Sequence, residues 1–487
     1  MKLIHQKLSR YKLSLQTLED PLLECAENEC SNQKNKPWVL LGSCVVSVIL
    51  LALTISIWGV RFLDQSKLSS AAITGRTQPL PPAQVMSCYY NTPEPNNAST
   101  HQLLPSQIDP HLCTHINIAF ACVIHKEIFL EPSQCDTVRE IVKLKQVNPQ
   151  LKVLLSVGGA GDKNGFSEMV IDHASRKVFI KSIKSILRNY SLDGVDLDWE
   201  FPALHLQDSH SAGRERQHFS QLLREIRAEY IREKRDYLLT VAIAAPEPIV
   251  DVAYDVDQIN LHVDFANIMT YDYHYYTKFT PFTGLNSPLF ARATEELYLA
   301  TLNINYTVQM YITKGLDKSK IVVGIPTYGH TFTLVNANNP AIGSPASGFG
   351  SVGSLGFAQY PEVCAFQRAH NLTARWEPRA RVPWLARARD WLSHDSPRSV
   401  AAKAAFARAR GLRGAMLYSL NADDFEGACG GARFPLALAA RRALRAATVR
   451  RACAVLYECT GRKAMALHVT PPLRNNARSD APGVGNR

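Results

Sequence analysis

The stretch "LDGVDLDWEFP", residues 192–202, places four acidic side chains in a segment that is otherwise rich in Leu, Val, Trp and Phe. They are Asp193, Asp196, Asp198 and Glu200. Carboxylates in apolar surroundings are unfavourable unless they are hydrogen-bonded, paired or used in chemistry. Because side chains alternate between the two faces of a β-strand, Asp196, Asp198 and Glu200 share one face and Asp193 lies on the other. The pattern predicts a strand with three carboxylates along one face.

Seven other short apolar segments repeat along the chain, separated by longer amphipathic stretches. With the acidic segment they lie at 84–90, 114–121, 151–159, 192–201, 237–246, 265–272, 320–329 and 413–420. Their apolar runs are continuous, as in parallel strands that are buried on both faces. We therefore predict an α/β fold, a (β/α)8 TIM barrel. An open doubly wound sheet is the alternative, but it requires a glycine-rich phosphate turn after its first strand, where this chain has "CYYNTPEP".

The segment between the seventh and eighth predicted strands is far longer than one helix requires. It is rich in β-forming and turn residues, which predicts a small α+β insertion at about 331–390. In such barrels the chemistry takes place where the strands end at their carboxyl side. Asp196 and Asp198 are therefore expected to face the barrel interior, with Glu200 at the rim.

A row of carboxylates has a direct consequence for acid–base chemistry. We expect Asp198 to raise the pKa of Glu200, which leaves Glu200 protonated and able to donate to a glycosidic oxygen. A calcium loop would need its acidic residues on a turn, and the intervening Val, Leu and Trp favour a strand; an unpaired structural cluster is a further alternative. A two-carboxylate glycosidase needs a second carboxylate about 5 Å away. The sixth predicted strand instead supplies Met269, Tyr271 and Asp272.

"DGVDLDWEFP" resembles the DxxDxDxE signature of family 18 glycoside hydrolases, in the arthropod-like animal chitinase branch. "LLSVGG", "FANIMTYDYH", "GLNSPL", "IPTYG" and "GAMLYSLNADDF" resemble further motifs of that family, in the same order. The similarity extends from about Val85 to Leu444, so the predicted catalytic barrel covers residues 83–448.

The resemblance implies retaining hydrolysis of β-1,4-linked N-acetylglucosamine in which the substrate's own acetamido oxygen is the nucleophile. Glu200 would be the acid and base, Asp198 would orient the acetamido group, and Asp196 would set the charge of Asp198. Tyr271 would hydrogen-bond the acetamido oxygen, and Asp272 would hold the distorted sugar. The implied substrate-binding residues are Tyr89, Gly158, Gly159, Phe201, Met269, Tyr328, His330 and Tyr418. Chitin or chito-oligosaccharides would be the substrate, and no cofactor or metal is expected.

Four positions depart from the family pattern. Tyr418 and His330 stand where the family usually has Trp and Arg, and Trp is missing at Pro93 and Ala160. Aromatic platforms that stack on sugars contribute on the order of 1 kcal/mol each, so we expect a slower or narrower enzyme. A lectin that binds chito-oligosaccharides without cleaving them is the alternative function, and a structural surface protein with a vestigial site is a third.

The resemblance also implies two disulfides, Cys88–Cys113 and Cys364–Cys429. We predict a third between Cys122 and Cys135, and Cys453 and Cys459 can pair within the tail.

The N-terminal part predicts a membrane anchor. Residues 38–60, "WVLLGSCVVSVILLALTISIWGV", are free of charge and long enough to cross a bilayer. More Lys and Arg residues precede this span than follow it closely, which places residues 1–37 in the cytoplasm. We expect a type II membrane protein with a stalk at 61–82 and an extracellular or lumenal barrel; secretion after cleavage is the alternative.

The residues after the predicted span fit that topology. Four glycosylation sequons, at Asn97, Asn189, Asn305 and Asn371, and eight of the eleven cysteines follow it. From Ala374 onward 21 Lys and Arg stand against 8 Asp and Glu, within a total net charge of +11. No aromatic-interleaved nucleic-acid module accompanies this excess, so we predict no nucleic-acid partner. Residues 449–487 are predicted to be a disordered tail.

Overall fold

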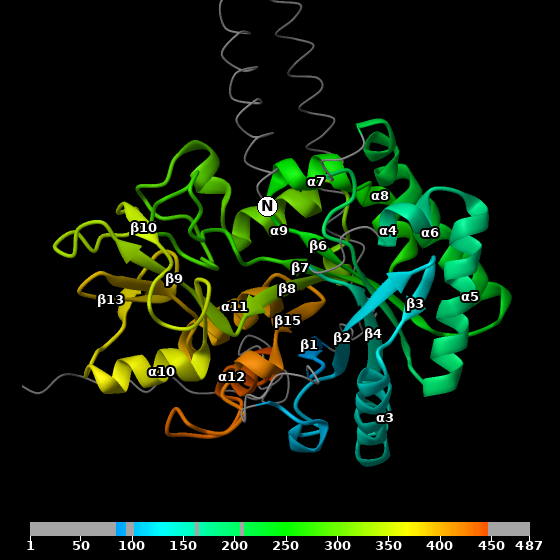
Figure 1. Ribbon diagram of the computed structural model, residues 1–487, viewed down its shortest axis with the longest axis horizontal. Coiled ribbons are helices and arrows are strands. Elements are labelled where there is room, and N and C mark those ends of the chain that lie inside the picture. Colours follow the sequence, from blue (N-terminus) through cyan, green and yellow to red (C-terminus); the bar gives the residue numbers. More distant parts are fainter. Residues whose placement is uncertain (1–83, 94–101, 161–164, 205–208, 447–487) are drawn as a thin grey trace, which may run out of the picture. The chain divides into compact units, whose positions relative to one another are not determined.

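The computed structural model describes residues 84–93, 102–160, 165–204 and 209–446 (Figure 1). The predicted anchor at 38–60, the flanking segments 1–37 and 61–82, the sequon at Asn97 and the tail at 449–487 lie outside these ranges. None of the helices within them is long and apolar enough to span a bilayer.

Eight parallel strands form the barrel. They are β1 (Val85–Asn91), β2 (His115–Ile124), β4 (Lys152–Gly158), β5 (Gly194–Asp198), β6 (Leu238–Ala244), β7 (Phe265–Met269), β8 (Ile321–Pro326) and β15 (Gly414–Tyr418). Strand β1 pairs with both β2 and β15, which closes the sheet. All eight predicted strands are present, so the barrel prediction is confirmed and the open-sheet alternative is excluded. Strand β3 (Glu127–Phe129) adds an antiparallel hairpin to β2.

Helices surround the strands in the alternation expected of this fold (Figure 1). They are α3 (Pro132–Val147), α4 (Gly165–Val170), α5 (His173–Tyr190), α6 (Ser209–Arg232), α7 (Glu247–Ala253), α8 (Val256–His262), α9 (Ile304–Thr313), α11 (Pro397–Ala409) and α12 (Pro435–Arg445). Several begin at side-chain caps, as where the Asp172 carboxylate accepts a hydrogen bond from the Ser175 N–H.

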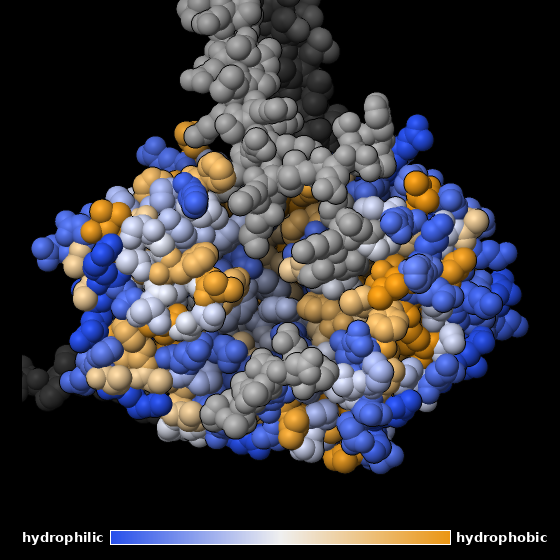
Figure 2. Space-filling view, in the orientation of Figure 1, coloured by the Kyte–Doolittle hydropathy of each residue, from blue (hydrophilic) through white to orange (hydrophobic). Residues whose placement is uncertain are grey.

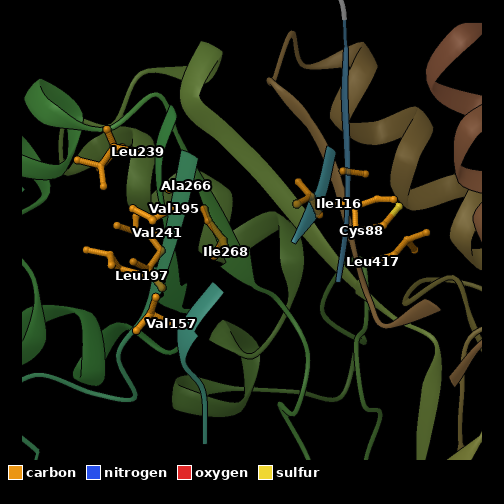
Figure 3. Packing of buried hydrophobic residues seen from close by; sticks show 14 of the residues in the cluster. Cys88, Ile116, Val157, Val195, Leu197, Leu239, Val241, Ala266, Ile268 and Leu417 are labelled. Atoms are coloured by element: carbon orange, nitrogen blue, oxygen red, sulfur yellow. The ribbon is translucent and has the colours of Figure 1, made fainter. Parts of the chain in front are cut away.

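The alternation along β5 separates two environments. Val195 and Leu197 belong to the large apolar cluster that also contains Leu239, Val241 and Ile268 from the neighbouring strands (Figure 3). Asp196 and Asp198 alternate with Val195 and Leu197 along the strand and are buried. Because each strand is apolar on the outer face toward the helices, the polar residues of this segment face the interior, as predicted.

The insertion forms a second, antiparallel sheet. Its strands are β9 (Tyr328–Leu334), β10 (Ala346–Gly348), β11 (Phe357–Gln359), β12 (Arg375–Glu377), β13 (Val382–Arg387) and β14 (Asp390–Ser393), with helix α10 (Tyr360–Ala369). The sheet order is β10-β9-β14-β13-β12, and β11 pairs with β9. Only Thr327 separates β8 from β9. The first residues of the insertion therefore lie at the carboxyl end of the barrel strands.

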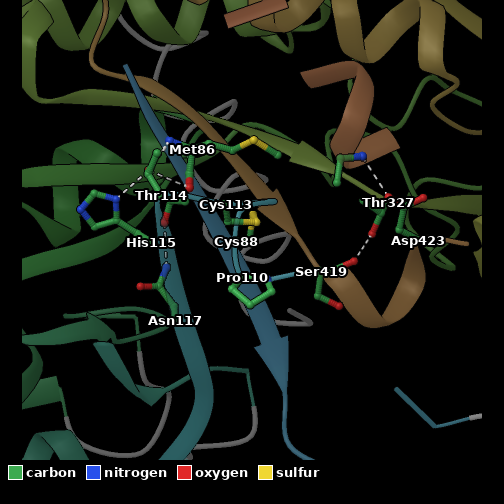
Figure 4. The surroundings of a disulfide bond; sticks show 12 residues. Met86, Cys88, Pro110, Cys113, Thr114, His115, Asn117, Thr327, Ser419 and Asp423 are labelled. Atoms are coloured by element: carbon green, nitrogen blue, oxygen red, sulfur yellow. Dashed lines mark hydrogen bonds between the residues drawn. A yellow bond between two sulfur atoms is a disulfide. The ribbon is translucent and has the colours of Figure 1, made fainter. Parts of the chain in front are cut away.

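The structure contains both disulfides that the resemblance implies. Cys88–Cys113 ties β1 to the segment before β2 (Figure 4), and Cys364–Cys429 ties α10 to the segment after β15. The predicted Cys122–Cys135 disulfide is wrong, since no bond joins these thiols. Cys122 lies opposite Phe129 in the β2–β3 hairpin, whereas the Cys135 side chain is hydrogen-bonded to Tyr190 at the end of α5.

Three sequons fall on described residues. Asn189 and Asn371 are exposed, and Asn305 is half-buried with its Oδ1 accepting a 2.6 Å hydrogen bond from Arg410. Glycosylation at the three sites stays a prediction.

Hydrophilic residues are prominent around the edge of the face in Figure 2, and less polar residues gather toward its middle.

Candidate active site

Asp196 lies at the centre of a hydrogen-bond network inside the barrel. Its Oδ2 accepts bonds from the Tyr89 hydroxyl at 2.6 Å and the Ser156 hydroxyl at 2.8 Å. Its Oδ1 accepts bonds from the Thr240 hydroxyl at 2.6 Å and the Asn267 amide at 3.2 Å. Burial raises the pKa of Asp196, and these four donors oppose the rise because they stabilise the anion. Asp196 is therefore held rigidly as an acceptor beneath the other two carboxylates.

Asp198 is the next inward residue, and its environment differs. It is 3% exposed, and its buried Oδ1 has no hydrogen-bond partner. Burial raises the pKa of Asp198 well above its usual range, and the nearby charges of Glu200 and Asp196 raise it further. A buried carboxyl oxygen without a partner is unfavourable in the free protein. Asp198 is thus a polar group that can gain a hydrogen bond from a bound ligand.

Glu200 follows β5 at the rim and is partly exposed. Burial raises its pKa to about 7, and the charge of Asp272 adds to the rise. The predicted elevation is present, and the charge of Asp272 contributes to it together with burial. The repulsion between Glu200 and Asp198 is mutual, and it raises the pKa of Asp198 as well. A carboxyl group with a pKa near neutrality can both donate and accept a proton at pH 7.

Asp272 lies just beyond β7 in a left-handed backbone conformation, with φ of 57°. Its N–H donates to Oδ1 of Asn286, which supports this conformation. Its Oδ1 accepts a 2.6 Å hydrogen bond from the Tyr328 hydroxyl and lies 2.7 Å from Nε2 of His330. The start of the insertion therefore binds the end of β7 and holds Asp272 near Glu200.

Tyr418 lies among four other aromatic rings. Its ring centroid is 5.5 Å from that of Tyr89, 6.0 Å from Tyr271, and 6.4 Å from both Phe120 and Tyr328. The Tyr418 and Tyr271 rings are stacked at 28°. Met269 packs against the same cluster. The aromatic rings form an aromatic lining at the carboxyl ends of β1, β2, β7 and β15 and at the start of β9. Rings arranged in this way can stack on the faces of a sugar.

Three other predicted binding residues have mainly packing roles in the free protein. A Cβ on Gly158 would lie 2.3 Å from the Asp198 carbonyl oxygen, and a Cβ on Gly159 would lie 2.8 Å from the Phe120 ring. Both glycines have positive φ and are buried, so they let β4 approach β5 and Phe120 closely. Phe201 packs against the outer apolar cluster rather than with the aromatic lining.

Several residues that shape the site lie outside the set predicted from the sequence. Ser156, Thr240 and Asn267 bind Asp196, and Asn286 binds the backbone of Asp272. A signal existed for the first three, because each is a polar residue in the middle of an otherwise apolar strand. Within the described ranges, no group of three or more His, Cys, Asp or Glu side chains is placed to hold a metal ion.

Comparison with known proteins agrees with this geometry. The family model described as "Glycosyl hydrolases family 18" matches residues 85–423. Mouse chitotriosidase-1 is 34% identical over 374 residues, which cover 74% of this chain and 78% of that protein. Human chitinase-3-like protein 2 is 32% identical over 399 residues, covering 79% of this chain and 99% of that protein.

Solved structures give the same result and include proteins of two kinds. The Group IV chitinase of Ostrinia furnacalis superposes with a TM-score of 0.70 and 32% identity, covering 74% of this chain and 100% of that one. Human YKL-39, described as a pseudo-chitinase with retained chitooligosaccharide-binding properties, superposes with a TM-score of 0.69 and 31% identity over 75% of this chain and 100% of that one. On its fold, its site and these matches, the chain belongs to glycosyl hydrolase family 18.

Proposed function

We propose that this protein is a chitinase-type glycoside hydrolase that cleaves β-1,4-linked N-acetylglucosamine chains, with Glu200 as the general acid. The single observation that supports this most strongly is the pKa of about 7 for Glu200, directly beyond the buried carboxyl group of Asp198. At neutral pH a large fraction of Glu200 is protonated, and the proton can pass to a leaving glycosidic oxygen.

Asp198 supplies the second element of the reaction. Its unpartnered Oδ1 can accept a hydrogen bond from the N–H of the substrate's acetamido group. That bond orients the acetamido oxygen toward the anomeric carbon and stabilises the positive charge that develops in the oxazolinium intermediate. The Tyr271 hydroxyl donates to the acetamido oxygen, and Asp196 stays fixed by its four donors. Glu200, now ionised, then takes a proton from the water that opens the intermediate, which regenerates the acid.

Release of a fluorophore from labelled chitobiose and chitotriose by the full chain tests the proposal. We expect turnover in the natural protein and a loss of at least about 100-fold in Glu200→Gln, which retains the shape of the side chain but cannot supply the proton. Lys145→Met is the matched control, because Lys145 pairs with Asp193 at the opposite end of β5. Turnover that persists unchanged in Glu200→Gln would overturn the assignment of the acid.

A non-catalytic chito-oligosaccharide-binding protein is the second candidate. The similarity to a described pseudo-chitinase favours it. The retained Glu200 favours the hydrolase. Binding of chitotetraose measured by calorimetry, with no turnover in the natural protein, would select the lectin.

We also propose that residues 38–60 anchor the chain with the barrel on the extracellular or lumenal side, or that cleavage in the stalk releases it. The cation bias around this span, the sequons and the two disulfides support that topology. Protease digestion of intact cells or vesicles tests it. In sealed vesicles whose cytoplasmic side faces outward, we expect the protease to digest the barrel only after detergent is added. Digestion without detergent would contradict the proposed topology.

A further inference from the structure

Lys403 and Asp395 form an ion pair that lies outside the row of catalytic carboxylates and is completely buried. Their side chains are 0% and 1% exposed, and Nζ of Lys403 lies 2.6 Å from Oδ2 of Asp395. Lys403 belongs to α11, and Asp395 follows β14 at the end of the insertion. A buried charge pair is weak support for stability because desolvation offsets most of the attraction. The other contacts of the pair therefore indicate its role.

The first contact is with Ser287. Nζ of Lys403 donates to Oγ of Ser287 at 2.9 Å, and Oγ of Ser287 donates to the backbone oxygen of Thr270 at 2.7 Å. A lysine ammonium group can only donate, so it occupies a lone pair of the Ser287 hydroxyl and leaves the hydroxyl proton for Thr270. The cation thereby fixes the direction of the hydroxyl that holds the chain just before Tyr271 and Asp272.

The neighbouring residue, Asn286, completes the connection. Its Oδ1 accepts the Asp272 N–H at 2.9 Å, and its Nδ2 donates to the Tyr328 backbone oxygen at 3.1 Å. Its own N–H donates to Oγ of Ser393 at 2.9 Å. Asn286 is 1% exposed, so these bonds are shielded from water. Asn286 and Ser287 together join the end of β7, the start of β9 and the end of β14.

From these contacts we propose that the Lys403–Asp395 pair is a positioning element for the reaction, which holds Asp272 beside Glu200 through Ser287 and Asn286. Neither Lys403 nor Asp395 reaches the substrate. The proposal rests on the function proposed above. It adds Lys403 and Asp395, about 130 positions further along the chain than Asp272, to the residues that influence the protonation of Glu200.

The proposed role predicts the direction in which the pKa of Glu200 changes when the pair is lost. The titratable groups that act on or with Glu200 are Asp198 on its own segment, Tyr254 after α7, Tyr271 and Asp272 after β7, and Tyr418 on β15. Lys403 and Asp395 face each other, and the buried His394 interacts with Asp395. Loosening the segment that holds Asp272 moves a negative charge away from Glu200. The pKa of Glu200 then falls toward its usual value of 4.5, and the proton is lost at lower pH.

Two variants test this in the full chain. Ser287→Ala removes the link and leaves the ion pair, and Lys403→Met with Asp395→Asn removes the pair without changing the net charge. In both, the basic limb of the kcat/KM profile on labelled chitotriose is expected to move down by about one pH unit. We expect kcat to fall about 10-fold or more while KM changes less, because the misplaced group acts in the transition state. Lys145→Met, which breaks a partly buried ion pair remote from these loops, is the control and should leave the limb in place.

The other outcomes overturn the proposal. A folded variant whose melting temperature falls while the basic limb stays in place would show that the pair is only structural. A limb that moves to higher pH would also contradict it. If the natural protein shows no turnover, the hydrolase proposal fails separately. The positioning proposal is then decided by carbon-13 NMR titration of Glu200, assigned with Glu200→Gln, in the natural protein and the two variants.

Discussion

Nε2 of His330 lies 2.7 Å from Oδ1 of Asp272, and Nδ1 of the same ring lies 3.3 Å from the backbone oxygen of Gly356. Both ring nitrogens thus face atoms that can only accept. His330 therefore helps to hold the Asp272 carboxylate, and the charge of Asp272 adds to burial in raising the pKa of Glu200.

Replacing His330 by Ala removes one of the contacts that hold the Asp272 carboxylate near Glu200. The pKa of Glu200 should then fall below about 7, and the basic limb of the rate profile should move down. His330→Gln, whose amide can still donate to Asp272, is the matched control and should leave the limb close to its natural position. An upward shift in His330→Ala would contradict this account of the pair.

Glu200 should also make the protein less stable as pH rises. The folded protein holds this proton up to a pH of about 7, whereas the unfolded chain releases it near 4.5. The native state therefore binds more protons between these values, and the free energy of unfolding falls as pH rises through that window. Because Glu200 is partly exposed, we expect about 2 kcal/mol rather than the full effect of the shift.

Urea unfolding of Glu200→Gln and the natural protein at pH 4 and pH 8 measures this difference. The variant should be more stable at pH 8, and the two proteins should converge at pH 4. Equal stability at both pH values would show that Glu200 does not have a raised pKa in solution.

The donors around Asp196 should matter for both stability and rate. Thr240→Val removes the 2.6 Å bond to Oδ1 with little change in shape. A lost hydrogen bond to a charged group costs about 2 kcal/mol, and we expect kcat to fall about 10-fold because Asp196 no longer holds its charge as firmly. Thr240→Ser, which keeps the hydroxyl, should retain most of the activity. Thermal unfolding and initial rates check the two effects; a fully active Thr240→Val would exclude this role.

Tyr418 should limit the affinity for sugar. Its ring contacts four other aromatic rings, and the family usually has a larger Trp at this position. Tyr418→Trp should strengthen chitotetraose binding by about 1 kcal/mol, which is roughly fivefold in Kd. Tyr418→Phe removes only the hydroxyl and should bind within about twofold of the natural protein. Calorimetry measures both, and weaker binding by the Trp variant would show that the surrounding aromatic rings leave no room for the larger side chain.

The Cys364–Cys429 disulfide should stabilise the insertion against the segment after β15. It closes a loop with a sequence separation of 65, for which restriction of the unfolded chain predicts up to about 4 kcal/mol. The double variant Cys364→Ser, Cys429→Ser should melt at a lower temperature than the natural protein. An unchanged melting temperature would mean that the contacts of α10 suffice without the bond.

Much of the architecture could be predicted because it depends on local pattern. All eight barrel strands were recognisable as continuous apolar runs, and the period of two correctly assigned Asp196 and Asp198 to the inner face. The insertion spans Tyr328–Ser393, slightly wider than the predicted 331–390, because β9 begins directly after β8. The Cys122–Cys135 prediction failed because the fold pairs Cys122 with Phe129 in the hairpin and places the Cys135 side chain against Tyr190.

The sequence by itself determined the barrel, the face occupied by the carboxylates and the identity of Glu200 as the candidate acid, since each follows from hydrophobic periodicity or a short motif. The tertiary structure alone decided that the charge of Asp272 acts on that acid, which donors hold Asp196, and that Lys403 and Asp395 connect to Asp272 through Asn286 and Ser287. These relationships join residues that are from 14 to more than 100 positions apart. Their physical basis is the closure of the sheet and the docking of the insertion, which bring strand ends together at distances that no local pattern encodes.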